Sequence, residues 1–327
     1  MIETHSAPRR LLARAMSNGR LAHAYLLEGP EGAGKRTLAF EFAASLVCEK
    51  RLFPPCRGCG SCRRVLNGTH PDVIRVEAEG RNIKIEDIRN LSSRFRLHSF
   101  EGGYKIGIIP EAELMNEASQ NAFLKTLEEP PADTVLIMTT TNLVRLLPTI
   151  ISRCQVMRLG PLPDRVIVEL LKEERGLDDE QAGLVAALAQ GNARKALDME
   201  LDFVVGFRKE LVKALLKLST DNFTEMLHFA ESASKCEHPM EAVLDLLSGF
   251  YRDVLYYKLG IKRLQNQDLE PEIAGQAQQG GIGAVLNQME MIHQARLRAL
   301  GNANPRLNWE LLTMALAGVE GAEITAS

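Results

Sequence analysis

The fold is decided by one glycine-rich stretch, Gly29-Pro30-Glu31-Gly32-Ala33-Gly34-Lys35-Arg36-Thr37. A short apolar run, residues 24–27, precedes it, and residues 37–46 follow it with apolar side chains at helical spacing. Glycines at such a strand-to-helix turn leave backbone N–H groups and a helix N-terminus available to bind phosphate. The stretch therefore predicts a P-loop, in which Lys35 places a positive charge near the outer phosphates of a nucleotide. The residues expected to hold that nucleotide are Gly29, Gly32, Gly34, Lys35 and Thr37.

The position after Lys35 departs from the P-loop pattern. The pattern requires a serine or threonine there to hold magnesium, and this chain has Arg36. Thr37 is not a simple replacement, because one step along a helix turns the side chain by roughly 100°. Binding of ATP or ADP stays open, whereas magnesium-dependent hydrolysis is not expected. The alternative is a glycine-rich turn that binds no ligand.

A second departure follows the apolar run at residues 106–109, which reads as a buried parallel strand. A P-loop hydrolase ends this strand with an aspartate for magnesium and a glutamate for water. Here the chain has Pro110, which has no carboxylate, followed by Glu111 and Glu113. Either glutamate could approach a metal or lie on the surface. Two expected magnesium ligands are therefore missing, at Arg36 and at Pro110, which indicates that the capacity to hydrolyse nucleotide has been lost.

Four of the six cysteines are close together in the sequence: Cys48, Cys56, Cys59 and Cys62. The last three form two overlapping C-x-x-C steps, with glycines that let the backbone curl around an ion. In a reducing compartment such a cluster is more consistent with a metal than with disulfides. We therefore predict a closed, structural Zn²⁺ site with these four ligands. A set of free surface thiols is the alternative.

Composition narrows the class of protein. The chain has 327 residues, a net charge of -3 and 5% aromatic residues, which argues against a generic basic nucleic-acid binder. No apolar run approaches the roughly 18 residues of a membrane span, and no signal-peptide core is evident. We expect a cytoplasmic protein with no membrane partner.

Strand and helix patterns alternate up to residue 160, which predicts a parallel sheet with helices on both faces. A proline-containing turn at residues 160–163 follows, and helical patterns dominate beyond it. The polar, glycine-containing segment 265–281 is predicted to be a loop. The predicted domains are an α/β P-loop domain over residues 1–160 with a zinc-binding insertion over 48–62, a small helical domain over 161–203 and an all-α domain over 204–327.

Several segments together resemble the clamp-loader branch of the AAA+ ATPases. They are His23-Ala24-Tyr25-Leu26, the P-loop, the four-cysteine insertion, Lys125-Thr126-Leu127-Glu128-Glu129-Pro130-Pro131, Leu147-Pro148 and Ser152-Arg153-Cys154. The resemblance covers roughly the first 200 residues, and the last third matches in length and helical character. It implies an AAA+ domain with a zinc module, a helical lid and a helical collar that assembles a hetero-pentameric ring. That ring opens a sliding clamp and places it on primed DNA.

The resemblance also implies roles for single residues. Arg153 is implied as an arginine finger that acts in trans on the nucleotide of a neighbouring subunit, and a guanidinium can stabilise phosphoryl charge. Arg194 is implied as a sensor-2 contact to a nucleotide held by this chain. Thr141 and Asn142 stand where sensor 1 is expected. A surface role for each arginine is the alternative.

The leading hypothesis is a clamp-loader subunit of the replicative DNA polymerase holoenzyme that hydrolyses no ATP itself. Its partners would be the other clamp-loader subunits, the sliding clamp and, through the complex, primed DNA. One alternative is an ATP-hydrolysing motor subunit of the same assembly. A second is an independent zinc-dependent DNA-binding protein, which the acidic balance and scarce aromatic residues disfavour.

Overall fold

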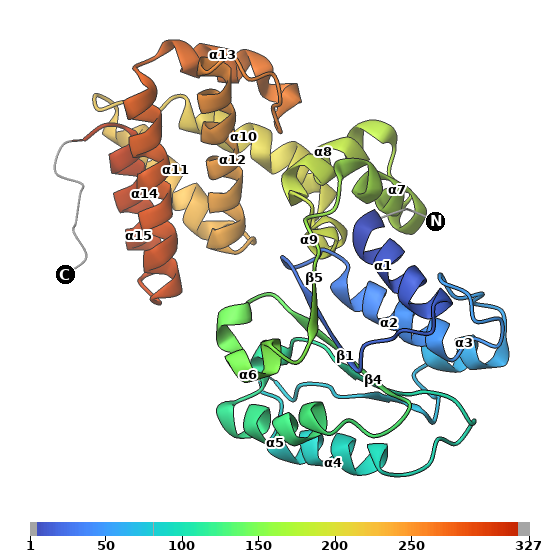
Figure 1. Ribbon diagram of the computed structural model, residues 1–327. Helices are drawn as coiled ribbons and strands as arrows, with labels where there is room; N and C mark the ends of the chain where they lie inside the picture. Colours follow the sequence, from blue (N-terminus) through green and yellow to red (C-terminus); the bar gives the residue numbers. More distant parts are fainter. Residues whose placement is uncertain (1–4, 81, 320–327) are drawn as a thin grey trace. The chain divides into compact units, whose positions relative to one another are not determined.

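The computed structural model describes residues 5–80 and 82–319. It divides into two compact units, shown in Figure 1. The first extends as far as Ile167 and includes Gly191–Lys195, and the second comprises Val168–Gln190 and the residues from Ala196 onward. The division into three domains stays a prediction. Residues 1–4, 81 and 320–327 of the predicted ranges lie outside the described residues.

The first unit is built on a five-stranded sheet with the order β2-β3-β4-β1-β5. Every pairing in it is parallel. The strands are β1 (Ala24–Glu28), β2 (Val73–Arg75), β3 (Lys105–Ile109), β4 (Thr134–Thr140) and β5 (Gln155–Arg158). The residues of β3 and β4 are buried throughout, as expected for a parallel sheet covered on both faces.

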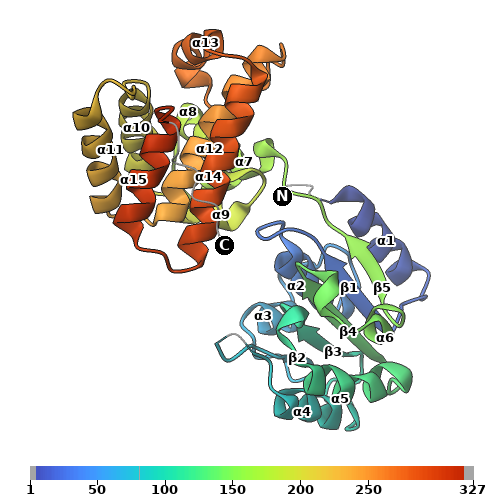
Figure 2. The ribbon, with the colours of Figure 1, turned by 90° about the vertical axis from the view of Figure 1, so that its left-hand side faces the viewer.

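Helices cover both faces of this sheet (Figure 2). The helical elements are α1 (Ser6–Ser17), α2 (Lys35–Leu46), α3 (Gly60–Leu66), α4 (Ile85–Phe95), η1 (Ala112–Leu114), α5 (Glu117–Glu128), η2 (Leu143–Arg145) and α6 (Pro148–Ile151). One face packs against Leu12 of α1 and Phe42 of α2, and the other packs against Leu91 of α4 and Phe123 of α5. The predicted α/β fold, a parallel sheet with helices on both faces, is thereby confirmed.

The rest of the described chain is helical. Its elements are α7 (Asp164–Arg175), α8 (Asp179–Ala189), α9 (Ala193–Asp198), the π-helical turn η3 (Phe203–Phe207), α10 (Arg208–Leu215), α11 (Phe223–Lys235), α12 (Met240–Lys258), η4 (Gln267–Leu269), α13 (Glu270–Gln278), α14 (Ile282–Leu300) and α15 (Pro305–Leu316). In the second unit, Arg208 is fully buried and donates to Asn266 Oδ1 and Asp268 Oδ2, each over 2.6 Å. These bonds satisfy a buried charge that would otherwise be costly.

The loop predicted over residues 265–281 is wrong, because η4 and α13 lie within it. Ile273 is completely buried and Leu269 is 1% exposed, so two apolar side chains anchor the segment. Pro271 lies in the first turn of α13, where its missing N–H costs nothing. A helix held by so few apolar residues has a polar composition, and this hid it from the periodicity pattern.

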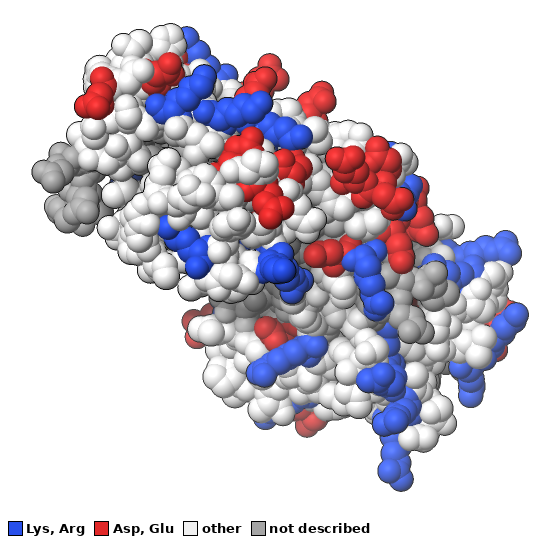
Figure 3. All heavy atoms as spheres, turned by 90° about the horizontal axis from the view of Figure 1, so that it is seen from above, with Lys and Arg blue, Asp and Glu red and all other residues white. Residues whose placement is uncertain are grey.

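The charged surface is mixed. Figure 3 shows both basic and acidic side chains on the face that it draws, so that face is not uniformly basic. Among the described residues, the longest apolar stretch of any helix falls short of what crossing a membrane requires.

Candidate functional site

The P-loop lies between β1 and α2, as the sequence predicts. Gly32 and Gly34 have φ values of 68° and 79°, a left-handed conformation that glycine adopts without strain. Gly34 is the N-cap of α2, and the Gly29 N–H donates to the Thr140 carbonyl on the neighbouring strand β4 over 3.2 Å. The loop therefore lies at the carboxyl edge of the sheet, where open α/β sheets bind ligands.

Lys35 is turned into the loop itself. Its Nζ donates to the carbonyl oxygens of Gly29 and Pro30, each over 2.7 Å, and only 8% of the residue is exposed. Burial lowers the pKa of the Lys35 ammonium, and the nearby Glu113 carboxylate partly opposes this change. The cation that a P-loop offers to phosphates is thus bonded to the loop's own backbone.

Residues distant in sequence hold the same loop. The Ala193 N–H donates to the Gly32 carbonyl over 3.1 Å, and His5 Nε2 lies 2.6 Å from the Ala33 carbonyl oxygen. Asn192 is so close that a Cβ added at Gly32 would come within 1.8 Å of its Oδ1. Asn192, which packs against the loop, lies two residues before Arg194, and the role of Arg194 as a nucleotide contact stays a prediction.

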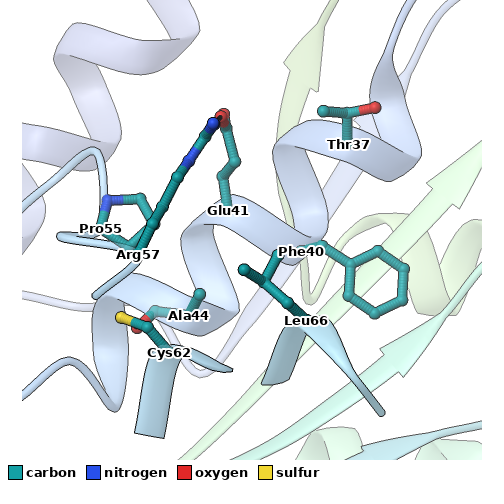
Figure 4. A pocket seen from close by; sticks show the side chains of 8 residues that line it. All are labelled: Thr37, Phe40, Glu41, Ala44, Pro55, Arg57, Cys62 and Leu66. Atoms are coloured by element: carbon teal, nitrogen blue, oxygen red, sulfur yellow. Dashed lines mark hydrogen bonds and ion pairs between the residues drawn. The ribbon is translucent and has the colours of Figure 1, made fainter. Parts of the chain in front are cut away.

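The two residues after Lys35, Arg36 and Thr37, contact other parts of the first unit than the P-loop. The Arg36 guanidinium lies over the Phe40 ring at 6.0 Å, and Arg75 lies over the same ring at 5.2 Å. Thr37 lines a pocket of about 210 Å³ whose other walls come from α2, α3 and the segment before α3, as Figure 4 shows. Glu41, which also lines this pocket, accepts a hydrogen bond from Arg57 over 2.7 Å.

The end of β3 brings a glutamate to the predicted sensor-1 position. Glu113 Oε1 accepts from the Thr141 N–H over 2.8 Å and from the Thr141 hydroxyl over 2.6 Å. Glu111 lies at a φ of 52°, and its N–H donates to Thr139 Oγ1 over 3.1 Å. Residue order alone did not reveal the pairing of Glu113 with Thr141.

The structure brings the four predicted cysteines together, with all four sulfurs within 4.8 Å of one another. Four sulfurs at about 2.3 Å from one tetrahedral Zn²⁺ would be about 3.8 Å apart. The Cys56 and Cys62 sulfurs are 3.9 Å apart, close to that spacing. Cys59 is the N-cap of α3, and its sulfur accepts from the Cys62 N–H over 3.4 Å. The residues therefore fit a four-sulfur zinc site.

The electrostatics of the cluster also suit a cation. Burial alone would raise the pKa of the Cys48 thiol, but N–H groups of Cys56, Leu52 and Lys50 that point at its sulfur lower the pKa to about 6. Burial and the neighbouring Cys59 sulfur raise the pKa of Cys62. The thiolate of Cys48 therefore forms readily, while full deprotonation of the set requires a compensating positive charge.

Arg153 follows α6 and is partly exposed, with 35% of its side chain accessible. One terminal nitrogen donates to Glu128 Oε1 over 2.8 Å, and the other donates to the Thr149 carbonyl over 2.9 Å. Glu128 was quoted from the sequence only as part of a motif, without a role. The one signal in the sequence that could have indicated a cationic partner for Glu128 was its position. A carboxylate at the C-terminal end of a helix is disfavoured by the helix dipole.

Comparisons with known proteins cover both units. A family model described as "DNA polymerase III, delta subunit" matches residues 4–163, and one described as "DNA polymerase III, delta subunit, C terminal" matches residues 205–317. The chain is 32% identical over 312 residues to DNA polymerase III subunit delta' of Bacillus subtilis, covering 94% of each chain. It is 34% identical over 303 residues to subunit delta' of Pseudomonas aeruginosa, covering 90% of each. It is also 29% identical to subunit tau of Bacillus subtilis, but over only 48% of that protein.

Proposed function

Because this chain belongs to the delta-prime subunit family of bacterial DNA polymerase III, we propose that it is the non-hydrolysing member of a clamp loader. In this proposal it assembles with other clamp-loader subunits into a hetero-pentamer. The assembly places a sliding clamp on primed DNA. The chain matches nearly the whole length of its delta' relatives but only about half of the tau subunit. This difference favours a delta' role over that of an ATP-hydrolysing motor subunit.

The observation that carries the proposal is the bonding of Lys35 to the carbonyls of Gly29 and Pro30. These bonds use two of the three N–H donors of the ammonium, so a phosphate would compete with the carbonyls of the loop for this cation. Asn192 packs against the same loop, and Arg36 lies over Phe40 instead of offering a magnesium ligand. These contacts support a loop that binds ATP or ADP weakly or not at all and keeps a structural role.

We further propose that the chain acts on a partner through Arg153. A guanidinium held at an exposed site can enter the nucleotide site of a neighbouring subunit and stabilise the charge that spreads over the transferred phosphoryl group. The remaining N–H groups of Arg153 suit this task, since a guanidinium has five donors and its hydrogen bonds to Thr149, Ser152 and Glu128 use at most three. The subunit would thus have no ATPase activity of its own and would complete the site of another.

The four cysteines would hold a structural Zn²⁺. Bound zinc would neutralise the thiolates and fix α3 against α2, and with four protein ligands it leaves no open position for catalysis. Cys48 lies two residues after the end of α2, and Cys62 lies within α3, so the ion would join these two helices.

The purified subunit should show no magnesium-dependent ATP turnover, because Pro110 follows strand β3 where a carboxylate would hold magnesium, and Lys35 is bonded within the loop. Steady-state phosphate release measures this, and calorimetry with and without magnesium should show the same weak or absent binding. Arg36→Thr should remain inactive, since it restores only one of two magnesium ligands. Turnover that Lys35→Ala abolishes would contradict the proposal.

A further inference from the structure

The guanidinium of Arg153 is held by an ion pair with α5. Glu128 in the last turn of α5 accepts from it over 2.8 Å, while the Thr149 carbonyl in α6 accepts from its second terminal nitrogen. A long side chain in solvent samples many rotamers. Two acceptors, one on each terminal nitrogen of the guanidinium, restrict it to few orientations.

The carboxylate that makes this bond stands where a helix disfavours it. Glu128 and Glu129 end α5, and negative charge at a helix C-terminus opposes the helix dipole. Glu128 is compensated by Arg153, whereas Glu129 pairs with no cation in the part of the chain that the structure describes. The two neighbouring glutamates carry the same charge and only Glu128 pairs with Arg153, so Glu129 serves as a control for the charge.

The ion pair is also supported by a rigid frame. Gln120 of α5 is 5% exposed, donates to the Arg145 carbonyl over 3.0 Å and accepts from the Leu147 N–H over 2.7 Å. It lies eight residues before Glu128, about 12 Å along the helix axis. Helix α5 is therefore fastened to the segment leading into α6 at one point and to Arg153 at another.

We propose that Glu128 is a positioning residue that presents Arg153 to the nucleotide of the neighbouring subunit. This inference rests on the proposed action of Arg153 in trans. Glu128 does not touch the nucleotide. It keeps the guanidinium in one orientation before the neighbour docks, so that little reorganisation is needed when phosphoryl charge develops.

The test uses the clamp loader reconstituted from this chain and its neighbouring subunits, with clamp and primed DNA present. Glu128→Gln should lower kcat for ATP hydrolysis at the affected site about 10-fold and leave KM for ATP unchanged, since misplacement of a reacting group by about 1 Å can cost about 100-fold. Glu129→Gln removes the same charge one residue away and should change neither. Glu128→Asp, which keeps the charge, should recover part of the rate.

Stability separates positioning from a structural role. An exposed ion pair contributes little to folding, and 50% of the Glu128 side chain is exposed, so Glu128→Gln should leave the melting temperature of the isolated subunit unchanged. In an Arg153→Ala background, Glu128→Gln should have no further effect on kcat.

A rate that Glu128→Gln leaves unchanged or raises, in a complex that Arg153→Ala slows, would overturn the positioning role and leave the proposed function standing. A lowered melting temperature that accounts for the lost rate would also overturn it. If Arg153→Ala itself leaves the rate unchanged, the proposed function fails first.

Discussion

Replacing Arg153 by alanine should slow ATP hydrolysis at the adjoining site of a reconstituted clamp loader by about 10³-fold. A guanidinium that enters a neighbour's nucleotide site contributes mainly to the transition state, where charge spreads over the phosphoryl oxygens. The loss should therefore appear in kcat, with nucleotide affinity changing less. Single-turnover hydrolysis, with the clamp and primed DNA present, isolates the affected site from the others in the ring.

Two variants sharpen this result. Arg153→Lys keeps the charge but loses the planar fork of donors, so most of the defect should remain. Arg145→Ala removes another exposed arginine near the same helix and should have no such effect, because only its backbone carbonyl is engaged by Gln120. An unchanged single-site rate with Arg153→Ala would remove the arginine-finger assignment. Equal losses with Arg145→Ala would point to a general charge effect instead.

Much of the fold was predictable because its elements follow local rules. Buried strands such as β3 appear as apolar runs, and α5 ends at Glu128 because Pro130 and Pro131 cannot continue a helix. Helix α3 was not predicted, since its seven residues lie inside the cysteine segment and are too few for a periodic signal. Helix α13 was missed for a related reason, because its burial depends mainly on one side chain, Ile273.

The sequence predicted which residues form the candidate site, but it did not predict the contacts between them. The P-loop and the four cysteines are contiguous motifs, so their spacing alone indicates their chemistry. The approach of Asn192 to Gly32 and the bond of Glu113 to Thr141 join residues far apart in the chain. Such pairings follow from how strands and helices pack. A single sequence carries no local signal for them.

Losing the metal should destabilise the first unit more than any single ion pair in it. A ligand that binds only the folded state stabilises it by about 4 kcal/mol when its free concentration is 1,000 times Kd. Cys59→Ser removes one sulfur and the N-cap of α3, so zinc content should fall from one per chain to near zero. The melting temperature should fall by roughly 10 °C, because about 1 kcal/mol corresponds to 2–4 °C for a unit of this size.

The chain supplies its own control in Cys236, a cysteine outside the four-sulfur cluster. Cys236→Ser should keep its zinc and its melting temperature, whereas Cys59→Ser should also become sensitive to proteolysis around α3. A seven-residue helix is too short to persist in water without its packing contacts. Buried Cys62 and Val65 then lose their places against the rest of the unit. Protein purified without chelator that carries no zinc, or a Cys59→Ser variant as stable as Cys236→Ser, would contradict a structural zinc site and leave the thiols to be explained by another ligand.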